Sequence, residues 1–501
     1  MRGIEAREIE VGTTTGIVLM ERAGEAVVAS ILGHWAGLAE RPRHAVVLCG
    51  PGNNGGDGYV VARLLAARGW RVDVQALGDP ARLPPDARVN HDRWVASGGK
   101  VSPFGAAVDG EADLLVDALF GIGLTRDFVP EHPFPRAART VAVDVPSGVN
   151  ADTGRALGAV VPADLTVTFH AAKLGHHLGD GPALCGALVV ADIGLPQGDE
   201  GVPLVGPPDP AGLRKAGAGH KFGHGHAVVL AGGTGRGGAA RLAARAALRV
   251  GAGLVTLAPP PEALAENAAR LDAVMLRTVA DAAALAEMLG DARITALCLG
   301  PALGTGPREA GLVGVALGLP VPGLPRDLDQ KGGPGSGPGR GRGGCALVLD
   351  ADALTLLSRH PDLFAALHEG CVLTPHDGEF ARLFPDLAEA SDRVAALRMA
   401  AERAGAVILS KGQATLIAAP DGRVALHSAA YGRAAPWLAT AGSGDVLAGI
   451  ITGLLARGMD PFGAACTGAW LHAECARAFG AGLIAEDLPD LLPAVLRALG
   501  V

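Results

Sequence analysis

The chain has 501 residues, of which 49% are hydrophobic and 19% charged, so it exceeds one ordinary domain and can fill more than one core. Its formal net charge of −8, with no dense basic stripe in either half, argues against nucleic acid as a main partner. Seven cysteines without a C-x-x-C pair argue against a zinc site or a disulfide framework and indicate reduced thiols.

The N-terminal segment MRGIEAREIE is charged and lacks the apolar core of a signal peptide. No apolar run along the chain reaches the roughly 18 residues that a membrane-spanning helix needs. We therefore expect a cytoplasmic protein that does not associate with membranes.

Short apolar segments of β type alternate with helical patterns through the first half. This alternation predicts a largely parallel sheet covered by helices, that is, a Rossmann-like three-layer αβα sandwich. A polar, Pro-rich linker over 198–210 then ends a first domain of residues 1–210 and leaves 211–501 for a second. The expected strands are residues 44–49, 71–77, 113–119, 140–145 and 165–169.

Three of these strands run into loops rich in glycine and short polar residues, at 50–65, 120–127 and 146–154. In the first loop we expect a helix to begin at about Gly56. Open α/β sheets bind ligands at the carboxyl ends of their strands. Asn54, Asp117 and Ser147 offer hard oxygen ligands for a monovalent cation, and Asp144 offers an acid or base. Turn and cap roles are the alternative for each loop taken alone.

The first half resembles the YjeF N-terminal family, the NAD(P)H-hydrate epimerases, in residues 6–24, 53–58, 117–124, 143–148 and 166–179. The resemblance implies that Asp144 is the catalytic acid/base and that Asn54, Asp117 and Ser147 bind potassium. It also implies the residues that hold the substrate, a hydrated nicotinamide nucleotide (NADHX or NADPHX). They are Asn53, Asn54, Gly55, Gly56, Asp57, Gly121, Ile122, Gly123, Leu124, Thr125, Arg126, Asp127 and Asp144.

The second half repeats the α/β alternation and ends in long helices. One segment departs from this alternation, because residues 319–344 are rich in Gly, Pro and Arg. This composition predicts a disordered surface loop inside the second domain. The expected strands are residues 226–233, 253–258, 295–300, 345–350, 370–375, 405–410 and 414–419.

Several loops of the second half carry polar side chains at strand ends. Asp350 and Asp352 are suited to magnesium, to hydrogen bonding or to starting a helix, and these alternatives stay open. His376 lies in a loop before a helix, with Glu379 in its first turn. Residues 410–422 have the form of a β-hairpin edge, whose Lys411 is placed to hold nucleotide phosphates or adenine.

The most informative segment is ATAGSGDVLAGIITGLLARG, residues 439–458, in which a small glycine-rich turn opens into an apolar helix with Asp445 at the junction. A helix N-terminus attracts phosphate, and a carboxylate there favours a base that takes a proton from the group being phosphorylated. A simple helix N-cap is the alternative. With the neighbouring glycine loops, this turn resembles the ribokinase-like superfamily.

More narrowly, residues 349–354, 374–383, 410–417, 440–459 and 482–489 resemble the ADP/ATP-dependent NAD(P)H-hydrate dehydratases, the YjeF C-terminal family. The resemblance implies Asp445 as the catalytic base, and Mg²⁺ together with ADP or ATP. Substrate contacts are implied at Ala239, Gly304, His376 and Asp445. Nucleotide contacts are implied at Lys411, Gly412, Gln413, Ala414, Thr415 and Gly444.

Together the two resemblances imply a bifunctional repair enzyme. Its first domain interconverts the R and S hydrates, and its second dehydrates the S form, using ADP or ATP and releasing AMP and phosphate when ADP is used. We expect a homo-oligomer. The alternative is a C-terminal small-molecule kinase of the vitamin-precursor type, joined to a non-catalytic nucleotide-binding module.

Overall fold

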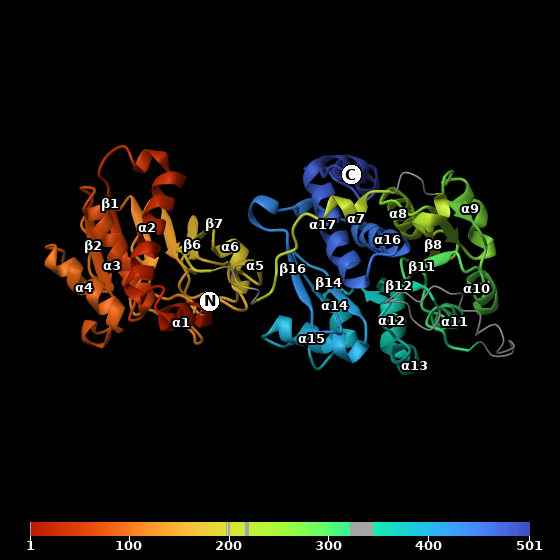
Figure 1. The fold of residues 1–501 in the computed structure, drawn as a ribbon, viewed down its shortest axis with the longest axis horizontal. Coiled ribbons are helices and arrows are strands. Elements are labelled where there is room, and N and C mark those ends of the chain that lie inside the picture. Colours follow the sequence, from red (N-terminus) through yellow and green to blue (C-terminus); the bar gives the residue numbers. More distant parts are fainter. Residues whose placement is uncertain (1, 197, 199–200, 216–219, 321–343) are drawn as a thin grey trace. The chain divides into compact units, whose positions relative to one another are not determined.

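The computed structural model describes residues 2–196, 198, 201–215, 220–320 and 344–501, and it divides into two compact units, Met1–Gly201 and Val202–Val501 (Figure 1). The boundary expected near residue 210 stays a prediction. The expected loop 319–344 lies, apart from its two ends, outside the described residues. Within the described ranges, no helix is both long enough and apolar enough to cross a membrane.

The first unit is built on a seven-stranded sheet of order β3-β2-β1-β4-β5-β6-β7, in which every pair is parallel. Its inner strands β1, β4 and β6 are buried along their whole length, which explains their near-continuous apolar sequence. The short β3, half exposed and ending in proline, adds to the predicted set. The strands are β1 His44–Cys49, β2 Arg71–Ala76, β3 Val101–Pro103, β4 Leu114–Ala118, β5 Thr140–Val143, β6 Leu165–Phe169 and β7 Ala187–Ala191.

Three helices, α2 (Gly16–His34), α3 (Asn53–Ala66) and α4 (Pro85–Ala96), pack on one face of this sheet, and α1 (Arg2–Val11) precedes them. The other face has a thinner cover, made of an aromatic cluster around Phe104 and Phe128 and of two short helices, α5 (Leu174–His177) and α6 (Gly181–Leu184). Thr166 of β6 donates a hydrogen bond of 2.7 Å to the Cys185 carbonyl just after α6.

Helix α3 begins at Asn53, so the expected start at about Gly56 is wrong by one turn. The glycines explain the difference, because they serve packing inside the helix and not a turn before it. A Cβ added at Gly55 would lie 2.0 Å from the Gly50 carbonyl oxygen, and one at Gly56 would lie 2.5 Å from Met20 Sδ. Only glycine lets the first turn of α3 lie this close to the end of β1.

The second unit is built on a nine-stranded sheet of order β10-β9-β8-β11-β12-β13-β14-β15-β16. Strands β14, β15 and β16 pair antiparallel, as the hairpin pattern over 410–422 predicts, and the remaining pairs are parallel. The strands are β8 His226–Leu230, β9 Leu254–Ala258, β10 Met275–Leu276, β11 Ile294–Leu299, β12 Ala346–Leu349, β13 Cys371–Leu373, β14 Val407–Ser410, β15 Ala414–Ala418 and β16 Val424–Ser428.

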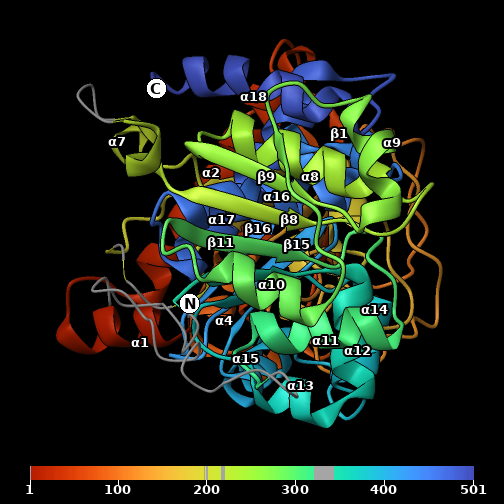
Figure 2. The same cartoon turned by 90° about the vertical axis from the view of Figure 1, so that its right-hand side faces the viewer.

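Helices cover both faces of this sheet (Figure 2). The four-helix side consists of α8 (Gly237–Arg249), α16 (Ser443–Ala456), α17 (Pro461–Phe479) and α18 (Asp487–Ala498). The opposite side consists of α10 (Ala282–Leu289), α11 (Pro307–Ala316), α12 (Ala351–Arg359), α13 (Pro361–Ala365), α14 (Asp377–Leu383) and α15 (Arg393–Ala404), with α7 (Pro210–Leu213) and α9 (Leu264–Ala268) peripheral to the sheet.

The small residues of α8 and α16 let these two helices approach closely. A Cβ added at Gly449 would lie 2.2 Å from the Ala243 carbonyl oxygen, and one at Gly453 would lie 2.6 Å from that of Ala247. This contact fixes α16 over β11 and β12, so the N-terminal turn of α16 is held in place by the core.

Each sheet reverses its strand order once, between β1 and β4 in the first unit and between β8 and β11 in the second. Ligands of open α/β sheets bind in the crevice at such switch points, outside the carboxyl ends of the strands. Of the glycine-rich loops singled out in the first half, 50–65 follows β1 and 120–127 follows β4, whereas 146–154 follows the next strand, β5. The predicted fold class, two α/β domains, is thereby confirmed.

Candidate active sites

Asp144 follows β5, and its backbone has a strained conformation that the surrounding structure must hold in place. Its φ is 67°, in the left-handed region that non-glycine residues rarely occupy. The carboxylate is buried, and its Oδ1 accepts a hydrogen bond of 2.8 Å from Thr168 and forms an ion pair of 2.7 Å with Lys173. Its backbone oxygen contacts His176 Nε2 at 2.9 Å.

Lys173, like Thr168 and His176, is a residue of this site that sequence reasoning missed. Its ammonium is nearly buried and donates to Thr168 Oγ1 at 2.7 Å and to the carbonyls of Phe169 and Ala171. His176 Nδ1 accepts the Lys173 backbone N–H at 2.9 Å. A signal was present in the sequence, because a threonine at the end of a buried apolar strand and a lysine just after it both need partners.

The pKa values of the Asp144 and Asp57 carboxyl groups are shifted in opposite directions. Burial alone would raise the pKa of Asp144, but the Lys173 ammonium and the hydrogen bonds from Lys173 and Thr168 lower it below its ordinary value. Burial, the Asp144 charge and Glu5 raise the pKa of Asp57 well above its ordinary value. Two carboxyls whose pKa values are shifted apart by their surroundings suit an acid and a base.

Asn54 and Gly121 adjoin Asp144. A Cβ added at Gly121 would lie 3.0 Å from Asp144 Oδ2 and 3.2 Å from Asn54 Oδ1. The loop after β4 thus brings these two oxygens to one place, and any larger residue at 121 would crowd both. The structure therefore groups three residues that the sequence assigned to this site.

The predicted potassium ligands lie in the same region. Ser147 donates to Asp117 through its backbone N–H at 2.8 Å and through its hydroxyl at 2.6 Å, and burial raises the pKa of Asp117. Asn54 Nδ2 is buried without a hydrogen-bond partner among the described residues. The donor set of amide, carboxylate and hydroxyl oxygens fits a hard monovalent cation. In the described ranges, no three His, Cys, Asp or Glu side chains form a metal cluster.

The remaining predicted substrate residues of this unit divide by exposure. Gly55, Gly56 and Leu124 are buried, and Leu124 packs in the aromatic cluster of Phe128. The exposed ones are Asn53, Gly123, Thr125, Arg126 and Asp127, while Ile122, like Asp57, is half-buried. Leu124 thus anchors a loop whose polar tip faces outward.

In the second unit, Asp445 lies in the first turn of α16. The helix is capped by Gly442 in the left-handed conformation (φ 90°), and no side chain caps it. Ser443 Oγ instead donates to the Leu438 carbonyl at 2.8 Å. Because neither Ser443 nor Asp445 serves as the cap, the N-cap interpretation of this turn is wrong, and Asp445 is left for another role.

The Asp445 carboxyl titrates close to neutral pH. Burial and the nearby Asp350 carboxylate raise its pKa to about 6, and Lys411 partly offsets them. A base with a pKa near the working pH combines the required ionised form with useful basicity.

Lys411 joins the polar residues around Asp445. Its Nζ donates to Asp350 Oδ1 at 2.7 Å and lies 3.8 Å from Glu379 Oε2. Asp350 Oδ1 also accepts from Thr374 at 2.8 Å, and Asp352 Oδ2 accepts the Gly304 backbone N–H at 2.8 Å. Of the alternatives left open for Asp350 and Asp352, the structure shows both hydrogen bonding and a position at a helix start, with Asp350 at the N-cap position of α12 and Asp352 in its first turn. Their suitability for magnesium stays a prediction.

His376 caps α14 with its Nδ1, which accepts the N–H of Gly378 at 3.0 Å, while Glu379 Oε2 accepts the His376 N–H at 2.9 Å. The expected positions of His376 before a helix and of Glu379 in its first turn are confirmed. Of the other predicted substrate residues, Ala239 lies in the first turn of α8 and Gly304 follows β11.

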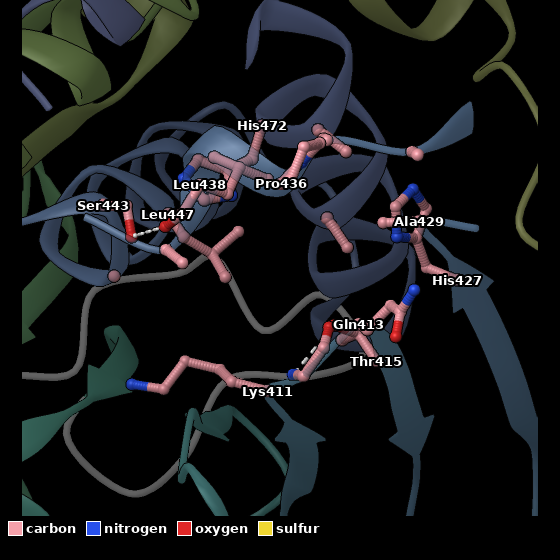
Figure 3. A pocket seen from close by; sticks show the side chains of 17 residues that line it. Lys411, Gln413, Thr415, His427, Ala429, Pro436, Leu438, Ser443, Leu447 and His472 are labelled. Carbon is pink, nitrogen blue, oxygen red and sulfur yellow. Dashed lines mark hydrogen bonds between the residues drawn. The ribbon is translucent and has the colours of Figure 1, made fainter. Parts of the chain in front are cut away.

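Next to the Asp445 turn lies a cavity of about 570 Å³ (Figure 3). Five predicted nucleotide residues line it, namely Lys411, Gly412, Gln413, Thr415 and Gly444. Ala414, in the same segment, does not line it. The rest of the wall is largely apolar, and it includes two histidines that sequence reasoning missed, His427 and His472.

Both halves of the chain match known families. The family profile described as "YjeF-related protein N-terminus" matches residues 16–175, and the one described as "NAD(P)H-hydrate dehydratase" matches residues 227–322 and 340–496. The chain is 38% identical to the bifunctional NAD(P)H-hydrate repair enzyme Nnr of Moorella thermoacetica, over 96% of this chain and 93% of that protein.

Two further relatives match one half each. The NAD(P)H-hydrate epimerase of Rhodobacter capsulatus is 50% identical over 35% of this chain and 88% of its own length. The crystal structure of the ADP/ATP-dependent NAD(P)H-hydrate dehydratase from Bacillus subtilis, co-crystallised with ATP and Mg²⁺, is 26% identical with a TM-score of 0.46, covering 60% of this chain and 99% of that one.

Proposed function

The chain belongs to the family of bifunctional NAD(P)H-hydrate repair enzymes, and from that premise we propose which residues of each unit perform the two reactions. The function is the repair of hydrated NADH and NADPH by an epimerase and an ADP/ATP-dependent dehydratase in one polypeptide. The observation that carries the residue assignment is a carboxylate in each unit, the buried Asp144 just after β5 and the half-buried Asp445 in the first turn of α16.

In the dehydratase unit, we assign Asp445 as the general base. The hydrate carries its hydroxyl at C6 of the nicotinamide ring, and hydroxide is a poor leaving group. Asp445 accepts the hydroxyl proton while the terminal phosphoryl group of ADP passes to that oxygen, leaving AMP. The first-turn amides of α16 and the Lys411 ammonium stabilise the charge on the transferring group.

The phosphate ester then eliminates. The C6–O bond breaks with its electron pair going to phosphate, and loss of the C5 proton restores the double bond of NADH or NADPH. The products are AMP and inorganic phosphate when ADP is the donor. Mg²⁺, arriving with the nucleotide, would neutralise phosphate charge.

In the epimerase unit, we assign Asp144 as the acid/base, held ionised by Lys173 and Thr168. The carboxylate Oδ2 faces the loop at Gly121, and we propose that the hydrated ring binds there. Asn54, Asp117 and Ser147 would hold potassium, which supplies positive charge beside the anionic nucleotide. Because a single dehydratase pocket cannot fit both epimers equally, this unit feeds the second one.

The proposal also covers the cellular location and the oligomeric state. A cytoplasmic location fits the seven cysteines, which are thiols and of which six are buried. A homo-oligomeric state stays a prediction that size measurement in solution can test.

The experiment uses the full chain with an epimeric mixture of hydrated NADH, ADP, Mg²⁺ and K⁺, and follows the return of reduced-nicotinamide absorbance and the release of phosphate. Complete recovery with one phosphate released per NADH formed supports both assignments. Recovery of only one epimer would refute the epimerase, whereas a stable phosphorylated product without recovered NADH would favour the small-molecule kinase.

A further inference from the structure

The short helix α5 brings a buried histidine to the epimerase site. His176, in this helix, is 0% exposed. The loop 146–154 holds the helix closely, because the Gly175 N–H donates to the Ala151 carbonyl at 2.7 Å and a Cβ added at Gly175 would lie 2.3 Å from the Asn150 carbonyl oxygen. The position of the imidazole is therefore set by a tight contact between two backbone segments.

Both ring nitrogens of His176 have hydrogen-bond partners in the backbone. Nδ1 lies 2.9 Å from the Lys173 backbone nitrogen, and because a backbone N–H only donates, Nδ1 accepts and carries no proton. Nε2 lies 2.9 Å from the Asp144 carbonyl oxygen, and because a carbonyl only accepts, Nε2 carries the proton and donates it. The two contacts allow only the neutral imidazole. Burial, which lowers the pKa of the ring to about 4, favours the same state.

The imidazole links the backbones of the two residues that form the buried ion pair of this site. The side chains of Lys173 and Asp144 meet at 2.7 Å, between Nζ and Oδ1. Their backbones, through the Lys173 N–H and the Asp144 carbonyl, are joined by the one rigid ring of His176. The two charged side chains therefore extend from backbone positions whose separation is fixed.

This link matters most at Asp144, because the backbone is strained there. A φ of 67° costs a non-glycine residue free energy that the surrounding structure must supply. Two hydrogen bonds hold the residue, one at each end. The Asp144 N–H donates to the Val167 carbonyl of β6 at 2.8 Å, and the Asp144 carbonyl accepts from His176. Without the second bond, the peptide after Asp144 is free to rotate toward a relaxed conformation, which moves the carboxylate away from Lys173.

We propose that His176 is a positioning residue of the epimerase, which holds the strained Asp144 backbone so that the carboxylate keeps its ion pair with Lys173. This placement also keeps Asp144 Oδ2 facing the loop at Gly121. The role rests on the proposed function, since it takes Asp144 to be the acid/base of the reaction. His176 does not itself act on the substrate, because its ring is buried and both nitrogens are engaged by the backbone.

Two substitutions separate the roles of the two ring nitrogens. In His176→Asn, the amide oxygen can take the place of Nδ1 and accept the Lys173 N–H, but no atom reaches the place of Nε2. In His176→Gln, the longer side chain can bring its amide N–H to the Asp144 carbonyl. The first variant thus removes the bond that holds Asp144, and the second retains it. His177→Asn, at the neighbouring buried histidine of α5, is the matched control for loosening of the helix.

The experiment measures kcat and KM for interconversion of the R and S hydrates by the full chain, followed by chromatography without nucleotide so that the second unit does not dehydrate them. In His176→Asn, kcat should fall about 10²-fold while KM changes by less than about 3-fold, because the catalytic group is misplaced and the substrate contacts remain. His176→Gln and His177→Asn should both keep kcat within about 10-fold of the native value. An equal fall in all three variants, an unchanged kcat in His176→Asn, or a rise in KM alone would overturn the proposal.

Crystal structures of the two His176 variants give a readout that needs no turnover. In His176→Asn, the Asp144 backbone should leave the left-handed region and its ion pair with Lys173 should open, whereas His176→Gln should keep both. An unchanged Asp144 in His176→Asn would overturn the proposal. So would a first unit that no longer folds in this variant, because the histidine would then serve the fold as a whole.

Failure of this proposal and failure of the proposed function give different results. If Asp144→Asn still interconverts the hydrates at the native rate, Asp144 is not the acid/base and the proposed function fails. The two crystal structures then still decide whether His176 holds the Asp144 backbone. If Asp144→Asn is inactive while His176→Asn keeps the native kcat, only the role of His176 fails.

Discussion

Replacing Asp445 by asparagine should abolish dehydration and at the same time stabilise the second unit at neutral and alkaline pH. The loss of activity follows from removing a general base, which typically contributes about 10²- to 10⁴-fold in rate. The gain in stability follows from the position of the carboxylate. Groups placed for catalysis are often unfavourable for the fold that carries them.

The size of the gain can be worked from the Asp445 environment. Burial and Asp350 raise its pKa from 3.8 to about 6, and at about 1.4 kcal/mol per pKa unit this corresponds to at most about 3 kcal/mol. Because the Asp445 side chain is partly accessible to solvent, the expected gain in unfolding free energy is smaller, roughly 1–2 kcal/mol. Because the folded-state pKa is raised, the native carboxyl stabilises the fold below pH 3.8 and loses that contribution as pH rises through 6. Asparagine does not ionise, so Asp445→Asn does not lose this stability as the pH rises. The variant should therefore be more stable than the native chain above pH 6, and the difference should disappear below about pH 4.

Calorimetry of the full chain can measure this, since the unfolding transition that ADP shifts upward identifies the second unit. At pH 8, without nucleotide, that transition should lie higher in Asp445→Asn than in the native chain. The exposed Asp421, whose pKa is lowered by Arg423, serves as the control, and Asp421→Asn should give no such gain. Equal or lower stability of Asp445→Asn at pH 8 would refute the reasoning.

Three further predictions concern the neighbours of the two carboxylates. Asp350→Asn should move the acid limb of the dehydratase kcat/KM profile from about pH 6 to lower pH, because a negative charge that raises the pKa of Asp445 is removed; an unmoved limb would contradict this. Lys173→Met should raise the pKa of Asp144 and slow epimerisation at neutral pH while dehydration of the S hydrate is unchanged, as a coupled assay with each epimer would show. Gly121→Ala should impair epimerisation more than it lowers the thermal unfolding temperature, because the added Cβ falls 3.0 Å from Asp144 Oδ2 and 3.2 Å from Asn54 Oδ1; unchanged epimerase kinetics would refute the placement of the ring.

The strands were predictable because their sequences are short, apolar and repeated in alternation with helices. β1 and β6 have the predicted bounds, His44–Cys49 and Leu165–Phe169. The two-residue β10 and the three-residue β3 were not, because so short a segment has no periodicity of its own and forms only where a neighbour supplies the ladder. The five-residue β7 and β16 were also missed.

The site was predictable where a residue type is rare at its position, and not where a long-range contact defines its role. Asp445 stands out at the opening of an apolar helix. In contrast, the ion pair of Lys173 with Asp144 is fixed by two strands that meet only in the folded sheet. His472 is similarly hard to find in the sequence, since a single histidine in an apolar helix has no pattern and its place in the cavity wall comes from the fold.

Each of the two carboxylates is assigned one reaction, and kinetics with separated epimers test this directly. The full chain carrying Asp445→Asn should still interconvert the R and S hydrates but return no NADH in the presence of ADP. With Asp144→Asn, the S hydrate should be dehydrated at the native rate and the R hydrate should remain, apart from slow spontaneous exchange. Loss of both reactions in both variants would contradict the assignment of two independent sites.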